Sequence, residues 1–325
     1  MSNPNNHRQP MAGQPVFKLG IDAGSCRFEV RINDVPILRS DVALPFDVEF
    51  PVSEWIVRGP NRIAALVLPP PVWDDEGNEL EERERFDPAE SALRLTLWVK
   101  QNGAPRETRQ AITTLNFVAR DVTPSPSGTE PGEGGWHGSA PAGRFDSRRE
   151  FMRDDQGGDV MISEVSFERN DEPPHEAFLY RDVGMRSPFP SWAWERGQTI
   201  TADDQTHAAL VAEYERVWGL LQARDEAAIE QLQATKAAEY RIAYHLDDAG
   251  LREALPLTDL MQSEDLQLQP LAKDDLELRV FGEGRLARLA DGDGDSPIVF
   301  VGPGEVGYFV ELTYCRTDGG WLLVR

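Results

Sequence analysis

The sequence predicts a protein in two parts, a β-sandwich followed by an α+β domain. A chain of 325 residues is long enough for two domains. Its 40% apolar content can form packed cores. Near residue 200 the apolar pattern changes from strand-like alternation to helical spacing. We therefore expect a disordered tail over 1–14, a sandwich over 15–186, a connector over 187–200 and an α+β domain over 201–325.

Short apolar segments separated by turn signals follow from Pro15 onward. Phe28 to Ile32 alternates strictly, and Asn33-Asp34 then predicts a tight hairpin turn. The segment Ile63 to Leu68 ends at three prolines. The expected strands are 16–21, 28–32, 35–38, 48–50, 55–57, 63–68, 93–99, 112–118, 160–167 and 177–180. Many short strands at such even spacing favour a sandwich.

Two insertions interrupt these strands. Residues 74–90 are mostly charged, which predicts a loop or a short solvated helix. Residues 121–159 are rich in Pro, Gly and Ser and then become mixed in charge. Such compositions bury too little surface to offset the entropy of ordering, so we expect a long, poorly ordered excursion within the sandwich.

The segment Ser187 to Trp194 contains two prolines and two tryptophans and marks the expected domain boundary. Exposed aromatic side chains there would form a platform for carbohydrate or protein binding through Trp192 and Trp194. The alternative is that both rings pack between the domains, and this is the interpretation that we favour.

The C-terminal part begins with helices and continues with strands. Thr201 is the expected N-cap of a first helix whose apolar residues follow a helical spacing from Leu210 to Leu221. Further helices are expected over 227–246 and 251–260, and strands over 276–281, 285–289, 298–301, 306–314 and 321–324. Helices followed by an antiparallel sheet predict an α+β domain.

The chain is strongly acidic, with 56 acidic and 33 basic residues and a net charge of −23. Such a charge repels phosphate, so we expect neither nucleic-acid nor anionic-membrane binding. No apolar run exceeds six residues, which excludes a bilayer-spanning helix.

Acidic residues are concentrated in the C-terminal part, where residues 201–325 contain 24 acidic and 11 basic residues. A solvated surface explains each cluster by itself, whereas several clusters together favour a surface that attracts a basic protein. The candidate partner-binding residues are Asp247, Asp248, Glu264, Asp265, Asp274, Asp275 and Glu277.

Motifs for catalysis or metal binding are weak. Asp291 to Asp295 has the alternating carboxylates of a calcium loop, but Gly302 occupies the position of the last acidic ligand, so a turn is favoured. Gly302 to Gly307 also predicts a turn, since no Lys-Ser or Lys-Thr follows it. His245 could form an acid–base pair with Asp247 or Asp248. Cys26 and Cys315 are expected to be two separate reduced thiols. We predict no metal, no cofactor and no enzymatic activity.

Two resemblances extend these predictions. The order of elements, with LLQARDEAAIEQL early and FVELTYCRTDGGWLLVR at the end, resembles the ketosteroid-isomerase-like cone fold, which implies a long strand in a curved sheet. The acidic chain without a secretory signal, its sandwich and the SPFPSWAW segment together resemble cytoplasmic immunity proteins of bacterial type VI secretion systems, in particular TsiT-type antagonists of nuclease effectors.

This second resemblance implies a cytoplasmic immunity protein that binds a basic toxin and blocks its active site with acidic side chains. One alternative is a small-molecule lyase or isomerase, or a binding module, that uses a pocket in the C-terminal cone with His245 as acid or base. The other is carbohydrate binding through Trp192 and Trp194. A deep pocket with a perturbed titratable group would favour the enzyme, and exposed coplanar aromatics would favour the carbohydrate-binding protein.

Overall fold

The computed structural model describes residues 13–71, 86–87, 90–119, 151–153, 159–166, 176–185, 187–273, 276–292 and 294–325. The chain forms two compact units, Met1–Pro188 and Phe189–Arg325, and the division falls inside the Pro- and Trp-rich segment. Each unit contains antiparallel sheets, and the helices of four or more residues in the described part of the chain belong to the second unit. The expected broad class, β followed by α+β, is therefore confirmed.

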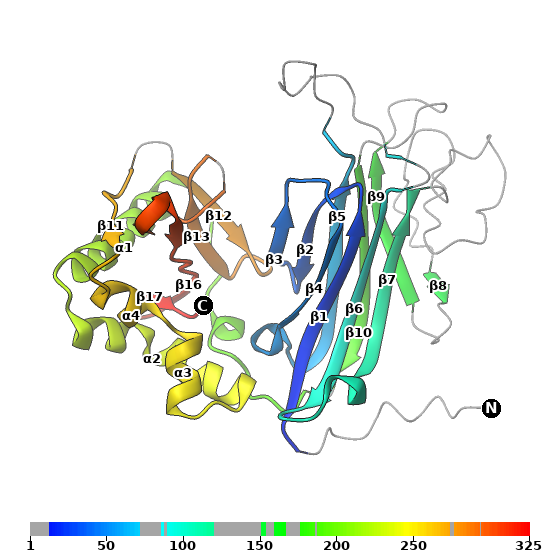
Figure 1. Cartoon of the computed structure of the whole chain (residues 1–325), viewed down its shortest axis with the longest axis horizontal. Coiled ribbons are helices and arrows are strands. Elements are labelled where there is room, and N and C mark those ends of the chain that lie inside the picture. The colour runs from blue at the N-terminus through cyan, green and yellow to red at the C-terminus, as the bar shows by residue number, and fades with distance from the viewer. Residues whose placement is uncertain are drawn as a thin grey trace. The chain divides into compact units, whose positions relative to one another are not determined.

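The N-terminal unit contains two antiparallel sheets (Figure 1). The four-stranded sheet has the order β4-β1-β6-β7 and the six-stranded sheet the order β3-β2-β5-β10-β9-β8. The strands are β1 (Pro15–Gly24), β2 (Arg27–Ile32), β3 (Val35–Ser40), β4 (Phe46–Pro51), β5 (Gly59–Leu68), β6 (Ala92–Gln101), β7 (Gln110–Val118), β8 (Phe151–Arg153), β9 (Asp159–Ser166) and β10 (Glu176–Met185).

Alternation of apolar residues explains the core of this unit. Phe17, Leu19 and Ile21 of β1 are buried, while the residues between them are less so. The predicted turn at Asn33-Asp34 joins β2 to β3, and its φ angles of 52° and 64° are those of a two-residue type I′ hairpin. The two sheets are linked by a hydrogen bond of 2.8 Å from the buried Arg181 guanidinium to the Thr113 hydroxyl.

Three expectations for the N-terminal unit need correction or fall outside the description. Residues 53–55 form a 3₁₀ turn and no strand, although a strand was expected over 55–57. Phe151–Arg153 is a strand within the excursion expected over 121–159, because it pairs with β9. The tail over 1–12, most of the insertion over 74–90 and the rest of 121–158 lie outside the described residues.

The C-terminal unit begins with four helices, α1 (Asp204–Gln222), α2 (Glu226–Tyr244), α3 (Asp248–Ala254) and α4 (Leu257–Gln262). Its strands form a sheet of order β11-β14-β15 and a sheet of order β12-β13-β16-β17. Their bounds are β11 (Gln267–Leu268), β12 (Glu277–Phe281), β13 (Leu286–Ala290), β14 (Val299–Val301), β15 (Gly307–Phe309), β16 (Tyr314–Thr317) and β17 (Gly320–Leu323). Among the described residues, no helix combines the length and hydropathy needed to cross a bilayer.

Aspartates start three of these helices. The side chains of Asp203, Asp225 and Asp247 accept hydrogen bonds from backbone N–H groups in the first turns of α1, α2 and α3. Thr201, the expected cap of α1, is thus wrong by two residues. The helix expected over 251–260 is two helices, because Pro256 lacks the N–H that would continue the first one.

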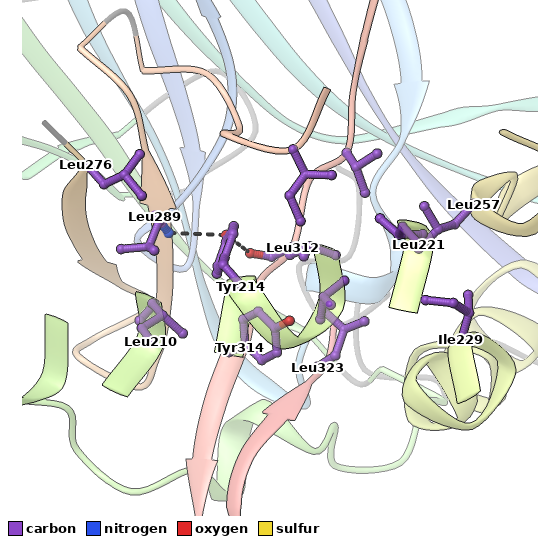
Figure 2. Packing of buried hydrophobic residues seen from close by; sticks show 14 of the residues in the cluster. Leu210, Tyr214, Leu221, Ile229, Leu257, Leu276, Leu289, Leu312, Tyr314 and Leu323 are labelled. Carbon is purple, nitrogen blue, oxygen red and sulfur yellow. Dashed lines mark hydrogen bonds between the residues drawn. The ribbon is translucent and has the colours of Figure 1, made fainter. Parts of the chain in front are cut away.

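Tyr214 organises the core of this unit (Figure 2). Its hydroxyl donates to the Leu312 carbonyl at 2.8 Å and accepts from the Leu289 N–H at 3.2 Å. Burial raises the pKa of this phenol. The centroid of the Tyr314 ring lies 5.9 Å from that of the Tyr214 ring. Because of its two hydrogen bonds, the Tyr214 hydroxyl joins helix α1 to strand β13 and to the segment before β16 within an apolar core.

The single strand expected over 306–314 is wrong. The structure divides it into β15 and β16, which belong to different sheets. Between them Leu312 bonds to Tyr214, and Thr313 donates its N–H to the Arg325 carbonyl at 2.7 Å. These bonds take the backbone away from the first sheet, so the one continuous long strand that the cone-like resemblance implies is interrupted here.

Candidate functional site

The acidic residues expected to bind a partner are distributed over three places in the C-terminal unit. Asp247 caps α3 by accepting the Gly250 N–H at 2.8 Å, and Asp248 pairs with Arg241. Glu264 and Asp265 are exposed between α4 and β11. Glu277 pairs with Arg279 at 3.2 Å in β12, and Asp274 and Asp275 lie outside the described residues. No hydrogen bond or ion pair between the described members of this set brings the three places together.

His245 occupies the C-cap of α2 with a left-handed φ of 55°. The two aspartates proposed as its partners are engaged with Gly250 and Arg241. His245 is also absent from the lining of the pocket that opens in this unit, which is described below. The pocket lining therefore contains no acid–base pair formed by His245.

The two tryptophans expected at the boundary are buried in the C-terminal unit. Trp192 has no exposed surface and Trp194 is 5% exposed. The Trp192 ring lies 5.2 Å from the Phe189 ring, and the Arg325 guanidinium lies 5.6 Å from its centroid. Carbohydrate stacking requires exposed rings, so the carbohydrate-binding alternative is wrong for these residues.

Turns occupy both glycine-rich segments, as predicted. The Asp291 carboxylate accepts the Asp295 N–H at 2.9 Å and closes the turn after β13. Asp293, between them, lies outside the described residues. Pro303–Glu305 forms a 3₁₀ turn in which Gly304 has a φ of 75°. In the described part of the chain, no three His, Cys, Asp or Glu residues gather as a metal would require.

Both cysteines are free and buried. Burial raises the pKa of Cys26 to about 12 and that of Cys315 to about 11. Since the thiolate is the reactive form, neither thiol has the environment of a catalytic nucleophile.

Sequence reasoning missed an apolar surface on β15, which we call the β15 surface. Val306, Tyr308 and Phe309 expose 52%, 44% and 48% of their area. Successive side chains of a strand point to opposite faces, so Tyr308 and Phe309 lie on the two sides of this strand. Exposed apolar side chains of this size are typical of a binding surface. The sequence carried one signal, the run Val-Gly-Tyr-Phe-Val without alternation, which cannot place all of its apolar residues on one buried face.

Among the described strands, β15 has a hydrogen-bonded neighbour on one side only. β15 lies at the edge of its sheet, next to β14. The Val306 carbonyl accepts a hydrogen bond from the residue after β14, and the Val310 N–H donates to the residue before it, each at 2.9 Å. Hydrogen-bonded residues alternate in an antiparallel pair, so the backbone groups of Gly307 and Phe309 point away from β14. An unpaired edge of this kind can accept another strand.

Acidic residues stand at both ends of this surface. Glu305 is exposed in the turn before β15. Glu311 follows β15 and is half-exposed, with its carboxylate 3.0 Å from Arg288. An apolar centre with charged ends has the composition of a protein-binding patch, in which apolar contacts are central and charges lie at the rim.

A pocket of about 150 Å³ opens beside the β15 surface, between α2, the α3–α4 region and the chain that follows β15. Its walls are mainly apolar, and Phe309 belongs both to the pocket and to the β15 surface. The polar lining residues are Gln233, Lys236 and Glu311.

Comparisons with known proteins return nothing: no family model, curated protein or solved structure matches this chain. The candidate site therefore depends on its own geometry.

Proposed function

We propose that this protein is a cytoplasmic immunity protein that binds a basic secreted toxin, a nuclease effector, and blocks its active site. The observation that carries the proposal is the β15 surface, an open strand edge with three exposed apolar side chains between two glutamates. A strand edge supplies backbone hydrogen bonds to a partner segment, and the apolar side chains exclude water from them.

The charge of the C-terminal unit supports a basic partner. Its excess of acidic residues attracts a basic protein over about one Debye length and so raises the association rate. Added salt screens this attraction and lowers the association rate. In this proposal the candidate acidic residues attract the partner electrostatically before contact. They are Asp247, Asp248, Glu264, Asp265, Asp274, Asp275 and Glu277. The close contact is made by β15.

The proposal also includes the fold of each unit, a β-sandwich followed by a cone-like domain. The two antiparallel sheets of the N-terminal unit, linked by Arg181 and Thr113, support a β-sandwich. The helices followed by antiparallel strands in the C-terminal unit support a variant of the ketosteroid-isomerase-like cone in which the long strand is broken.

The proposal is tested by capture and by rescue from toxicity. The tagged full chain is used to capture proteins from a lysate of its source cells at low and moderate salt. The double variant Tyr308→Ser, Phe309→Ser is compared with Val42→Ser, Leu44→Ser, which removes exposed apolar side chains from the N-terminal unit. We expect one stoichiometric basic protein with the wild type and the control, and none with the β15 variant.

The captured protein is then expressed alone and together with each form of the chain. We expect it to be toxic, with growth restored by the wild type and the control and not by the β15 variant. A captured protein that is harmless, or equal rescue by all three forms, would overturn the proposal.

The steering role of the acidic residues has its own test. Glu264→Lys with Asp265→Lys reverses two exposed charges in the segment before β11, outside β15 itself. We expect a lower association rate and a weaker salt dependence, with an unchanged dissociation rate. An unchanged association rate at low salt would exclude these two residues from steering.

A further inference from the structure

The pocket beside β15 has the size of one aromatic ring. A cavity of about 150 Å³ lined by apolar side chains is large enough to hold benzene, and this pocket has about that volume. Leu257, Leu260 and Leu312 contribute to its apolar walls. A six-membered ring fits this space.

One buried polar group faces this apolar space. Gln233 of α2 lines the pocket and is only 7% exposed. Within the described part of the chain, no hydrogen bond is found for its side-chain amide, and neither amide atom is among the fully buried atoms that lack a partner, so the amide keeps contact with solvent at the pocket. A ligand that covers the amide displaces this solvent, and a ligand that returns a hydrogen bond is favoured over one that does not. Gln233 therefore selects for a ligand that carries a hydroxyl or similar group at the tip of its ring.

The pocket and the open strand edge form one surface through Phe309. This side chain is 48% exposed on β15 and also lines the pocket. A strand that pairs with β15 would pass the mouth of the pocket, so one of its side chains can enter. Buried aromatic anchors beside an otherwise ordinary contact area supply most of the energy of many interfaces.

We propose that the pocket is an anchor site for a tyrosine in an extended, basic segment of the partner protein, with the ring between the leucines and the hydroxyl on the Gln233 amide. The segment pairs along β15, and its basic residues meet Glu305 and Glu311 at the two ends. This inference rests on the proposed function, since it names the segment that the β15 surface binds. The chemistry that it requires is a phenol, which distinguishes tyrosine from phenylalanine.

The chemical part of the inference is tested without any partner. p-Cresol and toluene, the side-chain analogues of tyrosine and phenylalanine, are titrated into the full-length protein and followed by amide chemical shifts. We expect p-cresol to bind about tenfold more tightly than toluene, as one hydrogen bond to a buried group provides. Gln233→Leu should bring the ratio to about one, since leucine retains the volume and removes the amide.

Gln231→Leu is the matched control, because Gln231 is exposed two residues earlier on the same helix. It should leave the preference unchanged. Equal binding of the two compounds by the wild type, no binding of either, or an equal effect of the two substitutions would overturn the assignment of Gln233. Lys236→Met provides a second pocket variant if Gln233→Leu does not fold, and it should keep the preference for p-cresol.

The docking part is tested with a peptide, Lys-Val-Tyr-Val-Lys, and its analogue with phenylalanine at the centre. We expect the tyrosine peptide to bind more tightly than p-cresol, to shift the amides of Gly307 and Phe309, and to lose affinity in Tyr308→Ser. A peptide that binds no better than p-cresol would show a site for free phenols and overturn the docking assignment. If p-cresol fails while the β15 variant still abolishes rescue, the anchor is wrong and the proposed function stands.

Discussion

Two aromatic segments of the C-terminal unit behave in opposite ways. Phe189 to Trp194 is the more conspicuous in the sequence, yet its tryptophans are buried. Val306 to Phe309 follows an ordinary turn, yet it exposes two aromatic rings and a valine. The comparison shows that aromatic content does not indicate a binding surface. What decides is whether the rest of the fold supplies partners for the rings.

The buried segment has those partners. The Glu239 carboxylate of α2 accepts the Ala193 N–H and pairs with the Arg325 guanidinium, which lies over the Trp192 ring. Arg325 is in turn joined through its backbone to Thr313. In the part of the chain that the structure describes, the β15 surface has a neighbouring strand on one side only. Three predictions test this difference and one concerns the start of α1, and they follow from the largest expected effect to the smallest.

Trp192→Ala should have the largest effect. The side chain is fully buried, so its removal leaves a cavity that costs about 3–5 kcal/mol of folding stability. The free energy of unfolding is measured by urea titration with a signal that reports unfolding of the C-terminal unit. A loss below about 1 kcal/mol would show that the segment is only loosely packed.

Glu239→Ala should be nearly as damaging, at about 3 kcal/mol, because it leaves the buried Arg325 charge without its carboxylate. Asp248→Ala is the matched control, since it removes the exposed pair with Arg241 and should cost less than about 1 kcal/mol. Urea midpoints of the two variants are compared under the same conditions. Equal losses of unfolding free energy in the two variants would mean that the buried ion pair contributes no more to stability than the exposed one.

Asp203 should make the start of α1 sensitive to acid. Its hydrogen bonds with Thr206 lower the pKa of the carboxyl below its ordinary value of 3.8. A carboxyl with a lowered pKa in the folded state stabilises it fully above the unfolded-state value, and this contribution is lost as the pH falls through the folded-state value. Stability measured from pH 6 to pH 2 should fall less steeply in Asp203→Ser, which keeps a cap without a charge. Parallel curves would contradict this role.

Tyr308→Ser should change the free energy of unfolding least, by about 0.5 kcal/mol or less, since the ring is exposed and an exposed site contributes little. Its effect should appear instead in the affinity for the partner. A large loss of stability, measured in the same urea titration as Trp192→Ala, would show that β15 supports the fold and is not reserved for binding.

Local signals in the sequence predicted much of the fold. The strand and turn at Phe28 to Asp34 were correct because alternation and an Asn-Asp turn are decided within a few residues. The helical spacing that begins at Leu210 was correct for the same reason. The helix predicted over 251–260 was wrong because it contains Pro256, which has no N–H to continue a helix.

The candidate site was not predictable in the same way. The segment 306–314 has the composition of one strand, and it is broken by bonds to Tyr214 and Arg325, which come from distant parts of the chain. The acidic residues were easy to find, but several cap helices or pair with neighbouring arginines. Nothing in the sequence distinguishes Gln233, which lines the pocket, from the exposed Gln231 of the same helix.

The sequence alone determined the mixed class, the positions of most strands and helices, the turns and the acidic charge, because these depend on residues close in the chain or on composition. Only the tertiary structure decided which aromatic side chains are buried, where β15 ends and which polar group faces the pocket. Burial is a property of what packs against a residue, and here the packing partners lie about a hundred positions or more away along the chain, as in the bond from Tyr214 to Leu312 and the contact of Arg325 with Trp192.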